Sequence, residues 1–143
     1  MRITTKGRYA VRAITQLAKV PDDKPLSIRR ISEMEDISPE FLEQIFFKLR
    51  KSNIISSVRG PGGGFRLNRK PMDISIAELF DAVEEGLYLT PCIRDSDSSC
   101  KRSSDCIVEA LWNNSYLHFR HYFEMTTLQD VLDGTYTKPL AKE

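Results

Sequence analysis

Residues 38–67, SPEFLEQIFFKLRKSNIISSVRGPGGGFRL, decide the fold because a strongly marked helix leads directly into a glycine-rich hairpin pattern. Ser38 is a favoured N-cap residue, Pro39 suits the first helical position, and Glu40 suits the positive end of the helix dipole. Four apolar residues recur at the helical spacing i, i+3, i+4 and i+7 and predict one buried face: Leu42, Ile45, Phe46 and Leu49. The residues predicted to face outward are Glu40, Glu43, Gln44, Phe47 and Lys48.

Two short strand-like runs, 54–58 and 65–68, enclose the segment RGPGGG at 59–64. Glycine and proline of this density mark tight turns, so the sequence predicts a β-hairpin with Arg59 before its tip and Arg66 after it. The glycine run is not a Walker A loop, because no Gly-Lys-Ser/Thr opens a following helix. A flexible tip without a ligand and a tip that contacts nucleic acid both stay open on this pattern alone.

The preceding residues predict two further helices. The first covers roughly 4–19, with Thr4 or Thr5 as its cap, and the second begins after Ser27. Three helices followed by a β-hairpin is the element order of a winged helix-turn-helix, in which the third helix enters the major groove of DNA. An arginine in the hairpin suits a narrow minor groove, and the amides of a glycine-rich turn suit phosphates.

The charge distribution agrees with contact to a polyanion. The 143 residues have a formal net charge of only +1, yet residues 1–70 contain 15 Lys+Arg against 7 Asp+Glu, a net charge of +8. Residues 71–143 contain 6 against 13, a net charge of −7. Such asymmetry between halves is expected when one half meets a nucleic acid. A chance division or complementarity between the two halves is the alternative that charge alone leaves open.

The C-terminal half is predicted to be helical around a polar loop. Ser75 to Glu78 has the pattern of a capping box that opens a helix reaching about Glu85. Segment 93–105 is loop-like, a long helix is expected from near Ser104 to about Phe123, and a short one follows Thr126 or Thr127. The predicted fold class is therefore mainly α with a small β-hairpin.

Three cysteines, Cys92, Cys100 and Cys106, have the spacing C-x7-C-x5-C in this polar segment. An odd number of cysteines does not suit a structural disulfide framework. An iron–sulfur cluster, a thiol–disulfide or nitrosation switch, and a zinc site are the three alternatives. Lys101 and Arg102 favour reactive thiolates, whereas the C-x2-C knuckle common in zinc sites is missing.

Three stretches closely resemble the IscR/NsrR family of bacterial winged-helix transcription regulators: MRITTKGRYAV (1–11), FLEQIFFKLRK (41–51) and SSVRGPGGGFRL (56–67). The similarity covers about residues 1–134, and the cysteines before Ala110-Leu111-Trp112 resemble the iron–sulfur branch. The resemblance implies a DNA-binding region at 1–70, and a connecting helix, cysteine loop, long dimerisation helix and C-terminal helix at 71–143. It also implies a homodimer bound to double-stranded operator DNA, and an iron–sulfur cluster, [2Fe–2S] favoured over [4Fe–4S].

The same resemblance implies roles for individual DNA-binding residues. Glu43 discriminates between two classes of site, and Arg59 enters the minor groove. Further contacts are expected from the third helix, from the residues around the start of the first helix, and from the backbone of the wing: Ser38, Glu40, Gln44 and Lys48; Arg2, Thr4 and Lys6; Gly60, Gly62 and Gly63.

The three cysteines are one ligand short of a complete cluster site. IscR-like members supply a histidine three residues after the last cysteine, and here that position is Glu109, on the same helix face as Cys106. NsrR-like members use an aspartate of the partner subunit, at a position aligned with Arg8, which cannot ligate. Asp105, a solvent molecule, a small thiol and the partner's Tyr9 stay open as the fourth ligand. Within one subunit, His118 and His121 are too distant, roughly 18 Å or more beyond Cys106 along a helix.

Several functional classes are excluded by what the sequence lacks. No run of eighteen apolar residues could form a transmembrane helix, and no signal peptide is visible, so we expect a cytoplasmic protein. No nucleotide loop, nucleophile constellation or paired carboxylates suggest an enzyme. The sequence predicts a homodimeric DNA-binding transcription regulator, a repressor, that senses cluster status, nitric oxide or redox state. A regulator of the same fold controlled by thiol redox or a partner enzyme, without a cluster, is the alternative.

Overall fold

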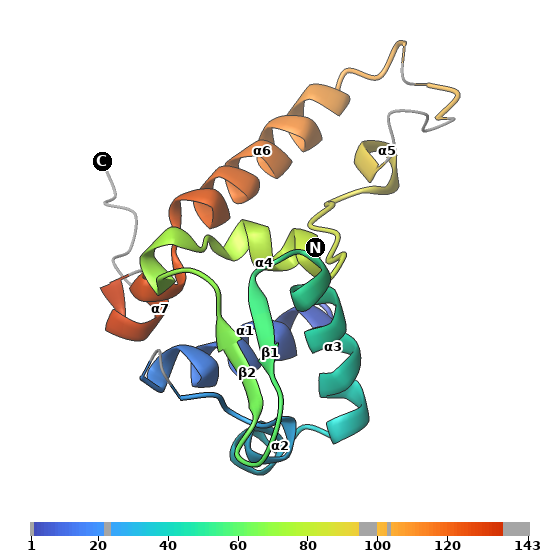
Figure 1. Cartoon of the computed structure of the whole chain (residues 1–143). Helices are drawn as coiled ribbons and strands as arrows, with labels where there is room; N and C mark the ends of the chain where they lie inside the picture. The colour runs from blue at the N-terminus through green and yellow to red at the C-terminus, as the bar shows by residue number, and fades with distance from the viewer. Residues whose placement is uncertain (1, 22–23, 95–99, 103, 136–143) are drawn as a thin grey trace.

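The computed structural model describes residues 2–21, 24–94, 100–102 and 104–135. Figure 1 shows α1–α3 and the hairpin gathered together, while α6 extends away from them with α5 near its far end. The predicted fold class, mainly α with a small β-hairpin, is confirmed. The elements follow in the order α1 (Thr5–Lys19), α2 (Ile28–Glu35), α3 (Pro39–Lys51), β1 (Ile55–Val58), β2 (Gly64–Leu67), the 3-10 helix η1 (Pro71–Asp73), α4 (Ile76–Ala82), α5 (Pro91–Arg94), α6 (Glu109–Met125) and α7 (Leu128–Asp133).

Local capping sets the boundaries of the helix-turn-helix. The Ser27 hydroxyl accepts a hydrogen bond from the Arg30 amide at 3.2 Å, and the Ser38 hydroxyl accepts one from the Phe41 amide at 3.3 Å. Asp36 ends α2 in the left-handed conformation, with φ 53°, which a short polar side chain tolerates. The chain therefore turns from α2 into α3 within three residues.

The two strands form an antiparallel hairpin whose register runs from Ile55 opposite Leu67 to Val58 opposite Gly64. Residue 26 pairs with the second strand, since the amides and carbonyls of Leu26 and Phe65 exchange two hydrogen bonds of 2.9 Å. A side chain at Gly64, where φ is +157°, would collide with the carbonyl group of Leu26. Glycine at this position therefore lets the wing lie directly against the segment before α2.

One hydrophobic core joins both halves of the chain. Phe46 of α3 packs edge-on against Phe65 of β2, with ring centroids 5.0 Å apart. The buried core residues come from both sides of the predicted boundary at 70/71, and include Ile14, Leu42, Phe46, Leu49, Leu79, Val83 and Leu128. That boundary therefore stays a prediction about the roles of two regions, which share one packed interior.

The C-terminal half differs from the sequence prediction in three places. Helix α4 ends at Ala82 rather than near Glu85, because Glu84 adopts a left-handed conformation with φ 55°. The capping box is only half formed: the Ser75 hydroxyl accepts from the Glu78 amide at 3.1 Å, but the Glu78 carboxylate contacts Arg69. Helix α5 was not predicted, and α6 begins at Glu109 rather than near Ser104.

The last helix returns to the body of the molecule. The Ile76 amide donates to the Thr126 carbonyl at 2.9 Å, and the Leu128 amide donates to the Ile74 carbonyl at 2.8 Å. Thr127 and Asp130 form a complete capping box, and Gly134 ends α7 as predicted. None of the described helices is both long enough and apolar enough to cross a membrane.

Candidate nucleic-acid interface and cysteine segment

The outer face of α3 is accessible and mostly polar, with Phe47 as its one large apolar side chain, as the helical periodicity predicted. Glu40, Glu43 and Gln44 are exposed, while Leu42 and Ile45 are buried on the opposite face. Ser38 was also predicted to contact DNA. Its hydroxyl caps the N-terminus of α3 by accepting a hydrogen bond from the Phe41 amide. Helix α3 thus presents two carboxylates and one amide to solvent on a helix fixed by its apolar face.

The wing presents Arg59 and backbone amides. Arg59 is exposed directly after β1, and Gly60 and Gly62 have φ of +99° and +74°, values that favour glycine. The Gly63 amide donates to the Gly60 carbonyl at 2.9 Å and closes the turn. The predicted wing residues therefore lie together at one narrow tip, with a cationic side chain beside it.

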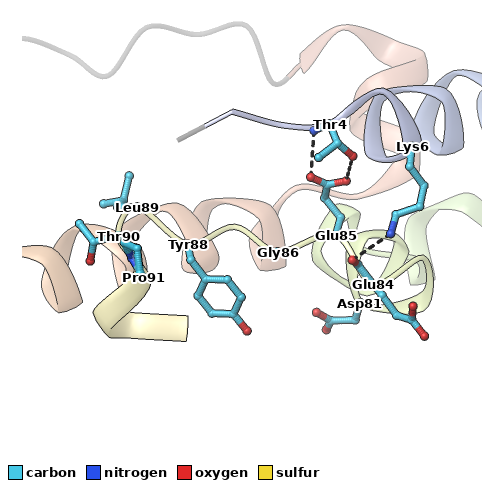
Figure 2. A pocket seen from close by; sticks show the side chains of 10 residues that line it. All are labelled: Thr4, Lys6, Asp81, Glu84, Glu85, Gly86, Tyr88, Leu89, Thr90 and Pro91. Carbon is cyan, nitrogen blue, oxygen red and sulfur yellow. Dashed lines mark hydrogen bonds between the residues drawn. The ribbon is translucent and has the colours of Figure 1, made fainter. Parts of the chain in front are cut away.

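The start of α1 is closed by a carboxylate from the distant segment after α4. Glu85, only 6% exposed, accepts hydrogen bonds from the Thr4 amide at 2.9 Å, from the Gly7 amide at 3.1 Å and from the Thr4 hydroxyl. Figure 2 shows the two contacts of Thr4 with Glu85 beside the hydrogen bond of 3.1 Å from the Lys6 ammonium to the Glu84 carbonyl. Of the three residues predicted near the start of the first helix, Arg2 is exposed, whereas Thr4 and Lys6 are engaged with residues 84 and 85.

A hollow of about 440 Å³ lies between the start of α1 and α3. Four of its lining residues were predicted, from two separate segments of the sequence, to contact DNA: Thr4, Lys6, Gln44 and Lys48. Thr5, Phe41 and Ile45 complete the lining. Hydroxyl, amide and ammonium groups of this kind are the donors that position phosphates in protein–DNA contacts.

A carboxylate of the same chain already contacts one lysine of this hollow. The Lys48 ammonium contacts the Glu84 carboxylate. The pKa of Glu84 is lowered from its ordinary value chiefly by its hydrogen bond with Lys48, then by the charge of Lys48, and further by the charges of Lys6 and Lys51. Sequence reasoning missed Glu84 and Glu85, because two acidic residues near a helix end have no distinctive spacing.

The segment after α4 leads from this hollow to the cysteines. A groove of about 750 Å³ follows it, lined by residues of the α1 start and by Asp81, Glu84–Gly86 and Tyr88–Pro91 (Figure 2). The Tyr88 ring stacks on Tyr116 of α6, with centroids 5.6 Å apart. Beside it, Arg120 of α6 donates two hydrogen bonds, of 2.6 and 2.7 Å, to Asp81 in the last turn of α4. The pKa of Arg120 is raised, mainly by its hydrogen bonds with Asp81 and Glu124. One short segment therefore contacts α1, α3 and α6.

The predicted ligands are spread along the chain from α5 to the first residue of α6. Cys92 belongs to α5, Cys100 is an exposed free thiol, and Cys106 is a half-buried free thiol. Glu109 is the first residue of α6, and its amide donates to the Cys106 carbonyl at 3.2 Å. Among the described residues, no three histidine, cysteine or acidic side chains gather around one point. The donor types suit an iron–sulfur cluster, because thiolates are its usual ligands.

Helix α6 exposes apolar side chains. None of its seventeen residues, all of which the structure describes, is buried. Tyr116, Arg120 and Phe123 lie on the side that contacts residues 80–88, where Phe123 packs edge-on against Phe80 at 5.1 Å. The exposed apolar residues of this helix include Leu111, Leu117, Phe119, Tyr122 and Met125.

Comparisons with known proteins agree with this geometry. The family model for Rrf2, described as an iron-dependent transcriptional regulator, matches residues 3–134. The transcriptional regulator IscR of Xenorhabdus nematophila is 40% identical over 139 residues, covering 93% of this chain and 84% of that protein. A putative regulator of Azotobacter vinelandii is 40% identical over 132 residues, covering 92% of this chain and 79% of that protein.

Solved structures share the whole arrangement. The IscR of T. potens superposes with a TM-score of 0.74 at 26% identity, covering 100% of this chain and 94% of that one. CymR, the global cysteine regulator of B. subtilis, superposes with a TM-score of 0.74 at 27% identity, covering 96% of this chain and 99% of that one. These relatives are DNA-binding transcription regulators rather than enzymes. The family resemblance is thereby confirmed, and this chain belongs to the Rrf2 family of transcriptional regulators.

Proposed function

We propose that this chain is a homodimeric, cytoplasmic repressor that binds a specific operator through α3 and the wing. The observation that carries this proposal is the hollow between the start of α1 and α3, which is lined by Thr4, Lys6, Gln44 and Lys48. A phosphate of the DNA backbone in this hollow fixes the orientation of α3, so that Glu43 faces base edges. Arg59 at the wing tip enters the adjacent minor groove.

We infer that an iron–sulfur cluster, [2Fe–2S] in preference to [4Fe–4S], controls this binding. Cys92, Cys100 and Cys106 would hold it, with Glu109 as the fourth ligand, three residues after Cys106. Because α6 begins at Glu109, Cys106 precedes the helix and the two residues do not share the helix face that the sequence predicted. Such a cluster supplies a centre that redox agents and nitric oxide modify. The segment from Glu84 to Pro91 supports the proposal, because it joins the first of these cysteines to the start of α1 and to α3.

The test compares operator binding by cluster-loaded and cluster-free protein. Anaerobically purified protein should be coloured and contain iron, and its binding isotherm on a footprinted operator should differ from that of the cluster-free form. Arg59→Ala should weaken binding to all duplexes and make the salt dependence shallower by about one counterion, whereas Glu43→Ala should change the preferred operator. Colourless, iron-free anaerobic protein contradicts the cluster, and two variants that bind as the wild type does contradict the DNA-contacting residues.

A thiol switch without a cluster is the second candidate, favoured by the exposed Cys100 beside Lys101 and Arg102. A solved structure of Staphylococcus aureus CymR in an oxidised form, 28% identical with a TM-score of 0.72, has the same fold. Cys100→Ser separates the two candidates. Under the thiol switch it removes the response of iron-free protein to oxidants, and under the cluster proposal it lowers the iron content.

A further inference from the structure

Phe47 is an exposed aromatic side chain in the middle of the outer face of α3. Its side chain is 59% exposed, although Phe46 beside it is fully buried. The buried face of the helix consists of Leu42, Ile45, Phe46 and Leu49, so Phe47 points away from the core. An apolar ring left in water contributes nothing to folding, so a contact with another molecule would account for its position on this face.

The surroundings of Phe47 indicate the class of its partner. Glu43 and Gln44 precede it by four and three residues, so the three side chains form one stripe along the helix. The Arg50 guanidinium lies 6.0 Å from the centre of the Phe47 ring, and Lys48 and Lys51 belong to the same end of α3. An apolar ring with cations on its C-terminal side suits a polyanion that also offers apolar groups, and is poorly suited to a purely apolar protein surface.

We propose that Phe47 contacts the 5-methyl group of a thymine in the major groove and is therefore a specificity-determining residue. The inference rests on the proposed DNA-binding function and names part of the sequence that is recognised. The thymine methyl is the apolar feature of the major-groove edge, and phenylalanine is one of the side chains that contact it. Phe47 lies about 4.5 Å beyond Gln44 along the helix axis, little more than one base-pair step. The thymine should therefore lie one or two base pairs from the position that Gln44 contacts.

The test removes single methyl groups from the DNA. A duplex is first selected by the wild-type protein from a random-sequence library, and each thymine is then replaced in turn by deoxyuridine, which lacks only the 5-methyl group. We expect wild-type affinity to fall about fourfold at one or two thymines, the factor that burial of one methyl-sized group supplies. Phe47→Ala and Phe47→Ser should bind the thymine and deoxyuridine duplexes equally at those positions, and Phe47→Leu should keep part of the difference.

Met72→Ala is the matched control, because Met72 is similarly exposed at 61% but lies in η1. It should retain the wild-type deoxyuridine pattern. All variants are compared at low salt, where backbone contacts keep binding measurable, and their circular dichroism should match the wild type because the ring is outside the core. Equal wild-type affinity for every deoxyuridine duplex, or full discrimination by Phe47→Ala, overturns the role of Phe47. Failure of the wild type to select any duplex overturns the proposed function itself.

Discussion

At the scale of single residues, Glu84 occupies a place that the proposed function assigns to DNA. Its carboxylate contacts Lys48, and the charges of Lys6 and Lys51 further lower its pKa. Because its folded pKa is lowered, the contact is fully formed near neutral pH and is lost as the pH falls through that lowered pKa. A phosphate that binds Lys48 must therefore displace a carboxylate of the same chain.

Glu84→Gln should accordingly strengthen DNA binding. We expect operator affinity to rise about two- to fivefold, the range for an exposed ion pair, and the salt dependence to steepen by about one counterion. Fluorescence anisotropy over a salt series measures both quantities. Glu124→Gln is the control, since Glu124 pairs with Arg120 on α6 and its substitution changes the net charge equally. Two outcomes would show that release of Lys48 is not the cause. One is an equal gain in affinity in Glu84→Gln and Glu124→Gln. The other is that Glu84→Gln raises affinity as much in a Lys48→Gln background as in the wild type.

Residues whose partners are near in sequence were predictable, and those with distant partners were not. Ser27, Ser38 and Thr127 cap helices through amides three residues away, so their chemistry is visible in the sequence. The contacts of Glu84 and Glu85 span 36 and 81 residues, respectively. A carboxylate of that kind is recognised only after packing has placed the end of α4 beside α1 and α3.

At the scale of elements, Glu85 joins α1 to the segment that follows α4. Its carboxylate accepts from three donors at the start of α1, and a side chain at Gly7 would collide with it. Glu85→Ala leaves these donors without their acceptor in a buried place, so we expect a loss of about 1–3 kcal/mol in the free energy of unfolding. Urea unfolding followed by circular dichroism measures the loss. Glu84→Ala, at the adjacent exposed position, is the control, and an equal loss in both variants would refute the role of Glu85.

The elements themselves were predicted according to the strength of their local signals. Helix α3 begins where its cap and proline predicted and buries the face that its apolar spacing predicted, because all these signals agree. Helix α6 begins five residues after the predicted serine, at Glu109, and no side chain caps it. Polar residues that can cap a helix also favour turns. Here they form a turn, in which the Asp105 amide donates to the Arg102 carbonyl at 3.0 Å. Tertiary contacts, rather than a cap, hold α6 in place.

At the scale of the whole molecule, the basic and acidic halves of the sequence carry different kinds of exposed surface. The half with net charge +8 contains α3 and the wing, and the half with net charge −7 contains α6 and its exposed apolar residues. A single chain leaves those residues in water, and several large apolar side chains exposed on one helix make α6 a candidate interaction site. The cysteines and α6 belong to the acidic half, whereas the residues proposed to meet phosphates on α3 and the wing belong to the basic half.

The proposed dimer can be tested on that face. Leu111, Tyr122 and Met125 lie on the side of α6 opposite Tyr116 and Arg120, which contact residues 81–88. Leu111→Glu should convert a dimer into monomers in sedimentation velocity runs, because it places a charge in an apolar interface. Operator affinity should fall at least tenfold, because a dimer binds two half-sites at once. Asn113→Glu adds the same charge to another side of α6 and should leave the dimer intact. If Leu111→Glu sediments as the wild type does at equal concentration, this face is not the dimer interface.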